Sequence, residues 1–229
     1  MNPVILQTDN LGKQFGEVTA VQSVNLRVQQ GEVFGFLGPN GAGKTTTIGM
    51  VLGLIHPTAG SITLFDQPVS PSQNRALQNV GSLIGAPAIV PYLTARENLQ
   101  LVARLHSGVD NGRIEEVLEL VGLTEAANRK VNGFSTGMKQ RLGLGAALLY
   151  RPALIILDEP TNGLDPAGMR EVRTLIRSLA DDGITVFLSS HLLNEVEQVC
   201  DRIAVISKGK IVAQGVVAEL LNQQEQSVK

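Results

Sequence analysis

Apolar residues along this chain fall into short runs and periodic stretches that predict a succession of strands and helices. Short or alternating apolar runs predict strands at residues 4–6, 21–28, 33–37, 60–65, 80–84, 153–157, 185–189, 203–206 and 211–213. Apolar residues at helical spacing predict helices at residues 45–52, 95–105, 111–121, 135–150, 167–180 and 191–199. Such alternation favours a doubly wound α/β fold with a parallel sheet and a functional site at the strand carboxyl ends.

Residues 87–150 follow a different pattern, which predicts helices and no strand. Thr94 and Glu97 have the spacing of a capping box before the first of these helices, and Gly122 is a stop signal after the second. We therefore expect a helical insert at 87–150, in an α/β core made of residues 1–86 and 151–229. The polar tail, residues 222–227, is expected to be frayed.

Composition narrows the class of protein. Hydrophobic residues make up 43% of the 229 positions, which is ample for a core. The 19 basic and 21 acidic residues are nearly balanced, which argues against a broad nucleic-acid-binding face. No apolar run reaches the roughly 18 residues of a membrane span, and the first three residues begin no signal sequence.

The single cysteine and two of the three histidines are not expected to act in chemistry. Cys200 excludes a disulfide framework within the chain and fits an intracellular location. Its apolar neighbourhood predicts a small buried side chain rather than a nucleophile. His56 and His106 have no motif around them and are expected on the surface.

Residues 38–45 match G-x-x-x-x-G-K-[ST], the phosphate-binding P-loop. A buried strand is predicted before the loop and a helix after it, which is the context that distinguishes this motif from a glycine-rich turn. Glycines let successive backbone N–H groups approach phosphate oxygens, and the helix N-terminus adds its positive dipole. Lys44 is placed for the β- and γ-phosphates, and the Thr45 hydroxyl for Mg²⁺.

A second chemical signal is the apolar run 154–157, which ends in Asp158 and Glu159. A strand that ends in carboxylates places charge at its tip, at the edge of the sheet where the P-loop also opens. Asp158 suits a Mg²⁺ shell and Glu159 a base that polarises water. The simpler interpretation is a solvated or capping pair of acids, but the P-loop favours the metal and base roles.

These motifs resemble those of the nucleotide-binding subunits of ABC transporters, and the resemblance runs from about residue 4 to residue 221. Lys44 and Thr45 match Walker A; Asp158 and Glu159 match Walker B with its catalytic glutamate. The resemblance implies a P-loop NTPase of the ABC ATPase fold over residues 1–229. That fold has a parallel core sheet, an N-terminal antiparallel β subdomain and a helical insert.

The resemblance also implies ATP and Mg²⁺ as cofactors and assigns site residues. Lys44, Glu159 and His191 would be catalytic, and Thr45 and Asp158 would hold the metal. The residues implied to bind nucleotide are Phe15, Gly38, Pro39, Asn40, Gly41, Ala42, Gly43, Lys44, Thr45, Thr46, Ser135, Gly137 and Asp165.

Residues 134–141 resemble the family's LSGGQ-like signature, from which they depart at Thr136 and Met138. Ser135 and Gly137 at a helix start would form a second anion site, although Ser135 could also be an ordinary N-cap. One P-loop already holds one triphosphate, so a second site would take the phosphate of another chain. The resemblance implies a head-to-tail homodimer with two ATP molecules between its subunits.

Three further residues have both a functional and a structural interpretation. His191, after Ser189 and Ser190, matches the switch histidine and could contact the γ-phosphate, although a lone histidine is commonly structural. Asp165 before Pro166 matches the D-loop and is also a credible N-cap. Phe15 matches the aromatic residue that stacks on adenine and could equally be a core side chain.

One position departs from the family. Where most members have Gln, and drug- and bacitracin-resistance members often have Glu, this sequence has Gly85, which has no side chain to contact Mg²⁺ or the attacking water. Either water completes the metal shell, or the corresponding position lies one residue away. The following residues, 87–99, resemble the drug-resistance subgroup more than importer ATPases.

The predicted function is therefore an ATP-hydrolysing subunit that powers export of a drug, peptide or lipid-like substrate. Its partner would be a separate membrane permease gripped by the helical insert and residues 85–93, which places the chain on the inner face of the cell membrane. One alternative is an ABC-type ATPase that acts on nucleic acid or the ribosome, which the charge balance disfavours. Another is a P-loop kinase or GTPase-like switch, which would leave residues 135–141 and His191 unexplained.

Overall fold

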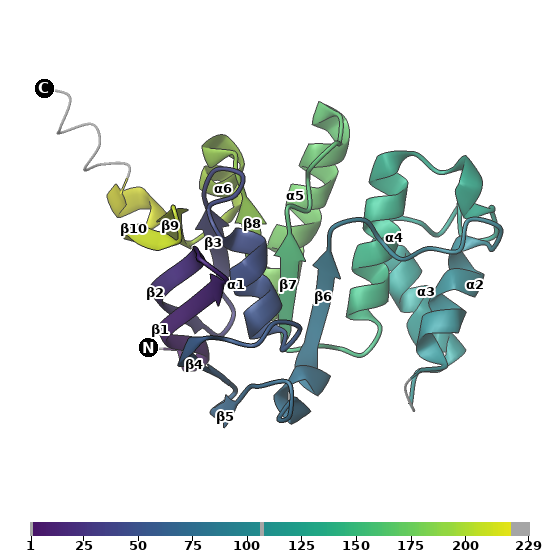
Figure 1. Ribbon diagram of the computed structural model, residues 1–229. Helices are drawn as coiled ribbons and strands as arrows, with labels where there is room; N and C mark the ends of the chain where they lie inside the picture. The colour runs from purple at the N-terminus through teal and green to yellow at the C-terminus, as the bar shows by residue number, and fades with distance from the viewer. Residues whose placement is uncertain (1, 106–107, 221–229) are drawn as a thin grey trace, which may run out of the picture.

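The computed structural model describes residues 2–105 and 108–220, which form two sheets flanked by helices (Figure 1). The larger sheet has the strand order β10-β9-β3-β8-β7-β6. Its strands are β3 (Val33–Leu37), β6 (Val80–Ile84), β7 (Leu154–Asp158), β8 (Thr185–Ser190), β9 (Arg202–Ser207) and β10 (Lys210–Val216). Five of them pair in parallel and β10 runs antiparallel to β9, which confirms the predicted parallel core.

The central strands β3, β7 and β8 are buried along their whole length, as expected of parallel strands covered on both faces. Phe34, Phe36 and Ile156 contribute to a core shared with the smaller sheet and the first helix. Val33 and Leu157 alternate with them and face a second core, shared with the remaining helices. The period-2 geometry of a strand thus gives the sheet one core on each face.

The smaller sheet is antiparallel, with the order β2-β1-β4-β5. It consists of β1 (Val4–Phe15), β2 (Val18–Gln29), β4 (Ala59–Leu64) and β5 (Gln67–Pro68). The expected N-terminal β subdomain is therefore confirmed. Strand β1 is longer than the predicted 4–6, because it pairs with β2 on one side and β4 on the other, and this backbone pairing carries the strand through polar residues up to Phe15.

The sheet helices are α1 (Lys44–Val51), α5 (Pro166–Asp181) and α6 (Leu193–Val199), and a 3₁₀ turn, η1 (Arg75–Asn79), precedes β6. Between β6 and β7 the described residues form α2 (Ala95–Ala103), α3 (Asn111–Leu120), η2 (Val131–Gly133) and α4 (Thr136–Leu148). Figure 1 shows α2, α3 and α4 gathered beyond β6, at one end of the molecule. The predicted strands and helices occur in the predicted order, while β5, η1 and η2 were not predicted.

The predicted helix signals occur where expected. Thr94 Oγ accepts a hydrogen bond from the Glu97 N–H, and the Glu97 carboxylate accepts one from the Thr94 N–H, which completes the capping box. Gly122 follows α3 with φ +63°, a left-handed conformation that favours glycine. His106 and the polar tail at 222–227 lie outside the described residues. None of the helices in the described ranges is long and apolar enough to cross a membrane.

Candidate nucleotide site at the strand ends

The glycine loop, residues 38–43, connects the end of β3 to the start of α1. Gly38 donates a backbone hydrogen bond to the Ser190 carbonyl, 3.1 Å away at the end of β8. A Cβ at Gly38 would stand 2.4 Å from the Ile206 carbonyl oxygen, so only glycine fits there. Gly43 caps α1 with φ +109° and no side-chain cap, which leaves the first N–H groups of α1 without a side-chain acceptor.

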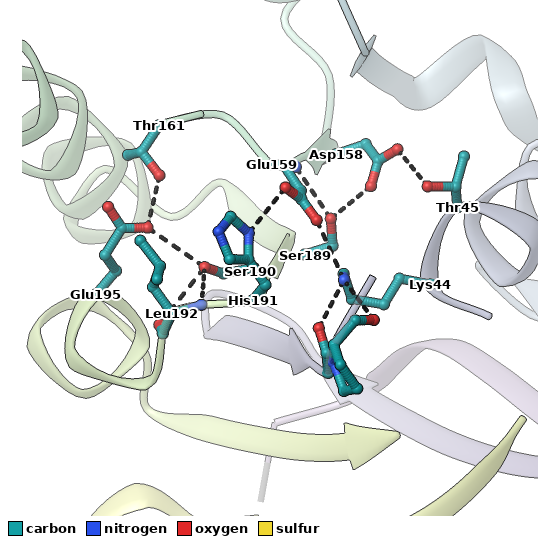
Figure 2. A network of polar contacts seen from close by, with 12 residues as sticks. Lys44, Thr45, Asp158, Glu159, Thr161, Ser189, Ser190, His191, Leu192 and Glu195 are labelled. Atoms are coloured by element: carbon teal, nitrogen blue, oxygen red, sulfur yellow. Dashed lines mark hydrogen bonds and ion pairs between the residues drawn. The ribbon is translucent and has the colours of Figure 1, made fainter. Parts of the chain in front are cut away.

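Lys44 is buried inside this loop, with only 5% of its surface exposed. Its ammonium donates to the carbonyls of Gly38, at 2.6 Å, and Pro39, at 3.2 Å. It also lies 3.1 Å from Glu159 Oε1. Lys44 and Glu159, which lie far apart in the sequence and were predicted to share one site, thus lie in contact in the structure (Figure 2).

Asp158, at the tip of β7, is hydrogen-bonded on both carboxylate oxygens. Thr45 Oγ1 donates to Oδ2 at 2.9 Å, and Ser189 Oγ donates to Oδ1 at 2.5 Å. Ser189 Oγ in turn accepts from the Glu159 N–H at 3.0 Å. One serine on β8 therefore holds both predicted acids of β7, and it does so because Asp158 and Ser189 are register partners in the parallel sheet.

Glu159 connects the lysine with the histidine. Figure 2 shows its carboxylate between Lys44 and His191, and its Oε2 lies 3.0 Å from His191 Nδ1. Its backbone is left-handed, with φ +51°, which is uncommon for a residue with a side chain. Unusual backbone of this kind clusters at functional sites.

The predicted residues of the helical region lie elsewhere. Ser135 is the N-cap of α4 and accepts from the Met138 N–H at 3.2 Å. In Figure 1, α4 is separated from α1 by β7 and β6. The structure therefore does not bring Ser135 and Gly137 to the glycine loop of the same chain. A Cβ at Gly137 would instead stand 3.9 Å from the Cα of Gly168, near the start of α5.

The remaining predicted residues lie at the ends of their elements. Asp165 is the N-cap of α5, where it accepts from the Gly168 N–H at 2.9 Å. Phe15 ends β1 with half of its surface exposed, and the Lys13 ammonium lies 4.8 Å from its ring centre. Pro39, Asn40, Gly41, Ala42 and Thr46 lie in the loop and the first turn of α1.

Gly85 directly follows β6, whose last residue, Ile84, is the register partner of Asp158. It has φ +62° and open space where a Cβ would stand. Its neighbours Ile84 and Ala86 also have no polar side chain. A shift of one residue in the correspondence would therefore still leave this position without a metal ligand.

The structure adds contacts that the sequence interpretation missed. Ser189 bridges the two acids, and Glu195 on α6 accepts hydrogen bonds from Thr161 and Ser190. A signal for Glu195 was present, because it falls on the apolar face of α6 together with Val196 and Val199. An acid on the buried face of an amphipathic helix requires polar partners.

The structure also shows the surroundings of Cys200 and His56 and of the side chains that could bind a metal. Cys200 is buried, and burial raises the pKa of its thiol well above the usual range, so it is not a reactive nucleophile. His56 is exposed, as predicted. Across residues 2–105 and 108–220, no group of three or more His, Cys, Asp or Glu side chains is arranged to hold a metal ion.

A glycine loop with a buried lysine, beside a strand that ends in two acids, defines a P-loop NTPase. A model of the ABC transporter family matches residues 21–162. The bacitracin transport ATP-binding protein BcrA of Bacillus licheniformis is 48% identical over 209 residues, which cover 91% of this chain and 68% of that protein. The lantibiotic transport ATP-binding protein SrtF of Streptococcus pyogenes is 42% identical over 208 residues, covering 91% and 89%.

Solved structures agree. An ATP-binding cassette of an ABC transporter in its ADP conformation has a TM-score of 0.87 at 26% identity, covering 98% of this chain and 97% of that one. A dimeric cassette in a post-hydrolysis state with ADP and Pi has a TM-score of 0.81 at 26% identity, covering 93% and 99%. The chain belongs to the ABC transporter family and is an ATP-binding and ATP-hydrolysing subunit of that family. The predicted family, its drug- and bacitracin-resistance subgroup and the ATPase activity are confirmed.

Proposed function

We propose that this subunit powers the export of a peptide, drug or lipid-like antimicrobial compound through a separate membrane permease. The observation that supports ATP hydrolysis at this site is the ion pair of Lys44 with Glu159, which joins the glycine loop to the tip of β7. The named relatives transport bacitracin and lantibiotics, which favours export of such compounds. The alternative role on nucleic acid or the ribosome finds no support among these relatives.

In the proposed mechanism, ATP phosphates enter the glycine loop and receive the N–H groups at the start of α1. Lys44 turns from Glu159 to the β- and γ-phosphates, which frees the glutamate. Glu159 then orients a water molecule for in-line attack on the γ-phosphorus and accepts its proton, while the bond from that phosphorus to the bridging oxygen breaks and ADP leaves. His191, held 3.0 Å from Glu159, stabilises the developing charge on the γ-phosphate.

We also propose a Mg²⁺ site at Thr45 and Asp158. Their side-chain oxygens are 2.9 Å apart, and Mg²⁺ is usually held by one or two carboxylates together with substrate phosphates, so the donor set fits. When bound, Mg²⁺ would neutralise negative charge on the phosphates. Because residues 84–86 have no polar side chain, we propose that water takes the position beside Gly85.

Two subunits are proposed to pair head to tail around two ATP molecules. Ser135 and Gly137 of one copy would then meet the phosphates bound at Lys44 of the other, with Asp165 beside them. Within one chain, β7 and β6 lie between α1 and α4, which supports this arrangement because a phosphate at the start of α4 would then come from another copy (Figure 1). Phe15 would stack on the adenine with its exposed ring.

The permease is proposed to dock on an apolar groove between β6, α2 and α4. This groove has a volume of about 380 Å³ and is lined by Ser82, Pro87, Ile89, Leu101 and Tyr150, among others. Tyr92, two residues after the lining residue Val90, exposes 76% of its surface. We propose residues 87–150 as the helical subdomain and residues 1–86 and 151–229 as the core, so that both contribute to this groove. Docking there would place the chain at the inner face of the membrane.

The catalytic assignment is tested with Glu159→Gln in the subunit reconstituted with its permease. The variant is expected to keep ATP affinity, to accumulate ATP-bound dimers and to lose about 10²-fold or more in turnover, because the amide cannot accept the proton. Steady-state phosphate release and size-exclusion chromatography measure this. Glu119→Gln, exposed on α3, is the matched control and should hydrolyse ATP normally. Full turnover of Glu159→Gln would remove Glu159 as the base.

The direction and cargo need a separate measurement. Inside-out vesicles that contain the subunit and its permease should take up labelled bacitracin when ATP is added, and Glu159→Gln vesicles should not. ATP hydrolysis without uptake of bacitracin would retain the ATPase and reject this peptide as the cargo.

A further inference from the structure

Glu195 is a buried acid whose role the hydrolytic site does not yet explain. It lies in α6 with 7% of its surface exposed. Its Oε2 accepts hydrogen bonds from Thr161 Oγ1 at 2.6 Å and from Ser190 Oγ at 3.3 Å. Figure 2 shows its carboxylate between these two hydroxyls. Burial of a carboxylate is costly, so these contacts require an explanation beyond packing.

The second carboxylate oxygen of Glu195, Oε1, adds to the cost of burying this side chain. Within the described ranges, Glu195 Oε1 is buried without a hydrogen-bond partner. No cation of those ranges lies within ion-pair distance of either oxygen. A buried carboxylate oxygen without a partner costs stability, so the core gains little from this acid. The position is therefore better explained by what the carboxylate holds than by its contribution to the core.

The two hydroxyls belong to the segments that carry the proposed base and switch histidine. Thr161 follows Glu159 by two residues, and Ser190 immediately precedes His191. Backbone pairing between β7 and β8 ends at Asp158 and Ser189. Ser190 is still paired with Leu37 of β3, but beyond Asp158 no ladder joins the Thr161 segment to β8. The carboxylate of Glu195 ties them together where the ladder stops.

We propose that Glu195 is a positioning residue for ATP hydrolysis. By holding Thr161 and Ser190 on one carboxylate oxygen, it keeps the Glu159 carboxylate and the His191 imidazole at their 3.0 Å separation. It touches neither reacting group itself. The inference rests on the catalytic roles proposed for Glu159 and His191.

Kinetics of the full-length subunit with its permease test the inference. Glu195→Ala is expected to lower kcat for ATP hydrolysis about tenfold to 100-fold, because sub-ångström to 1 Å displacement of catalytic groups has effects of this size. The KM for ATP should change less than about threefold, since the glycine loop is untouched. Glu195→Gln retains an oxygen acceptor and should keep kcat within about threefold of the wild type.

Two further variants sharpen the result. Thr161→Val removes one donor at constant shape and should lower kcat in the same direction, without a further loss when combined with Glu195→Ala. Glu197→Ala, on the same helix but partly exposed, is the control and should behave as the wild type. A Glu195→Ala enzyme with the kcat of Glu197→Ala would overturn the inference.

A structural measurement separates this inference from the proposed function. In crystals of Glu195→Ala, the Glu159 and His191 side chains should move beyond hydrogen-bond distance, while the wild type keeps them in contact. An unchanged 3.0 Å contact overturns the inference whether or not the chain hydrolyses ATP. If Glu195→Ala does not fold, Thr161→Val crystals decide the same question. A wild type without ATPase activity would instead reject the proposed function.

Discussion

At the scale of single residues, the polar side chains at the strand ends are paired with one another. The Lys44 ammonium is satisfied by two carbonyls and by Glu159, and Asp158 by two hydroxyls. Each of these contacts uses a group that we expect to serve phosphate, metal or water in the working cycle. The site is therefore built with its polar groups paired, as burial at this depth requires.

The Ser189 hydroxyl is expected to matter to both stability and rate. Ser189→Ala removes a charge-assisted hydrogen bond to Asp158 and the acceptor of the Glu159 N–H. We expect a loss of about 2 kcal/mol in the free energy of unfolding, measured by urea denaturation, together with a lower kcat. Ser61→Ala, at an exposed position of β4, should stay within about 0.5 kcal/mol. Equal stability of the two variants would contradict this prediction.

The Glu32 carboxyl gives a pH dependence of known sign. Burial raises its pKa above the ordinary 4.5, and the hydrogen bond from the Gln29 N–H and the nearby Arg202 reverse only part of that shift. The folded state thus binds this proton more tightly than the unfolded chain does. The resulting stability is present at low pH and is lost as the pH rises through the folded-state pKa.

Glu32→Gln makes this measurable, because it removes the titration, and the ion pair with Arg202, while keeping an oxygen acceptor for the Gln29 N–H. The wild type is expected to gain stability relative to the variant as the pH falls from about 7 towards about 4.5. Urea unfolding of both proteins across that range gives the difference. A difference that is constant, or that falls with the pH, would show that burial does not dominate at Glu32.

At the scale of elements, the helix starts differ in whether a side chain caps them. The helices α2, α3, α4 and α5 begin at a polar N-cap whose side chain accepts from the third residue of the helix. Helices α1 and α6 begin without a side-chain cap, at Gly43 and Leu192, and only α1 follows the glycine loop. Each of the side-chain caps satisfies one N–H group of its helix, so the start of α4 can still offer others to an anion, whereas no side-chain cap takes up any N–H group at α1. This difference supports phosphate binding at α1.

Ser135 has both a structural and a proposed functional role, and the two can be separated. Ser135→Ala should cost about 1 kcal/mol of stability as a lost N-cap. Asp110→Ala, at the N-cap of α3, is the matched control and should cost a similar amount. Only Ser135→Ala is expected to impair ATP-bound dimer formation, measured by chromatography in the Glu159→Gln background. Equal dimer formation in both would leave Ser135 as a cap only.

At the scale of the whole molecule, the predicted site residues fall into two groups. The glycine loop, Asp158, Glu159 and His191 meet at the carboxyl ends of β3, β7 and β8, while Ser135 and Gly137 lie beyond β6 (Figure 1). Under the proposal above, a single chain would therefore carry two halves of a site that do not meet. Two copies in head-to-tail symmetry would complete two sites at once.

Mixing variants tests this division between subunits. Lys44→Ala disables the loop of one chain, and Gly137→Asp places a negative charge at the α4 start of another. A heterodimer of the two retains one site with both halves intact. The mixture is therefore expected to hydrolyse ATP faster than either variant by itself. A chain that carries both changes, mixed with either single variant, should give no such increase in ATP hydrolysis. A mixture no faster than its components would reject the shared site.

The sequence by itself determined the order of strands and helices along the chain, the helices between β6 and β7, the capping box at Thr94 and the glycine loop with its flanking elements. These features follow from local periodicity and backbone chemistry, which a few neighbouring residues decide. It also identified Asp158, Glu159 and His191 as candidates, through motif and position. The extent of β1 escaped it, because pairing with β2 and β4 overrides the polar residues of that strand.

Only the tertiary structure decided which candidates meet. Lys44 reaches Glu159, and Ser189 reaches Asp158, because the sheet places β3, β8 and β7 side by side. Glu195 became interpretable only once Thr161 and Ser190 were seen on one carboxylate. Such contacts join residues far apart in the chain, and their partners depend on strand order, which no local pattern specifies.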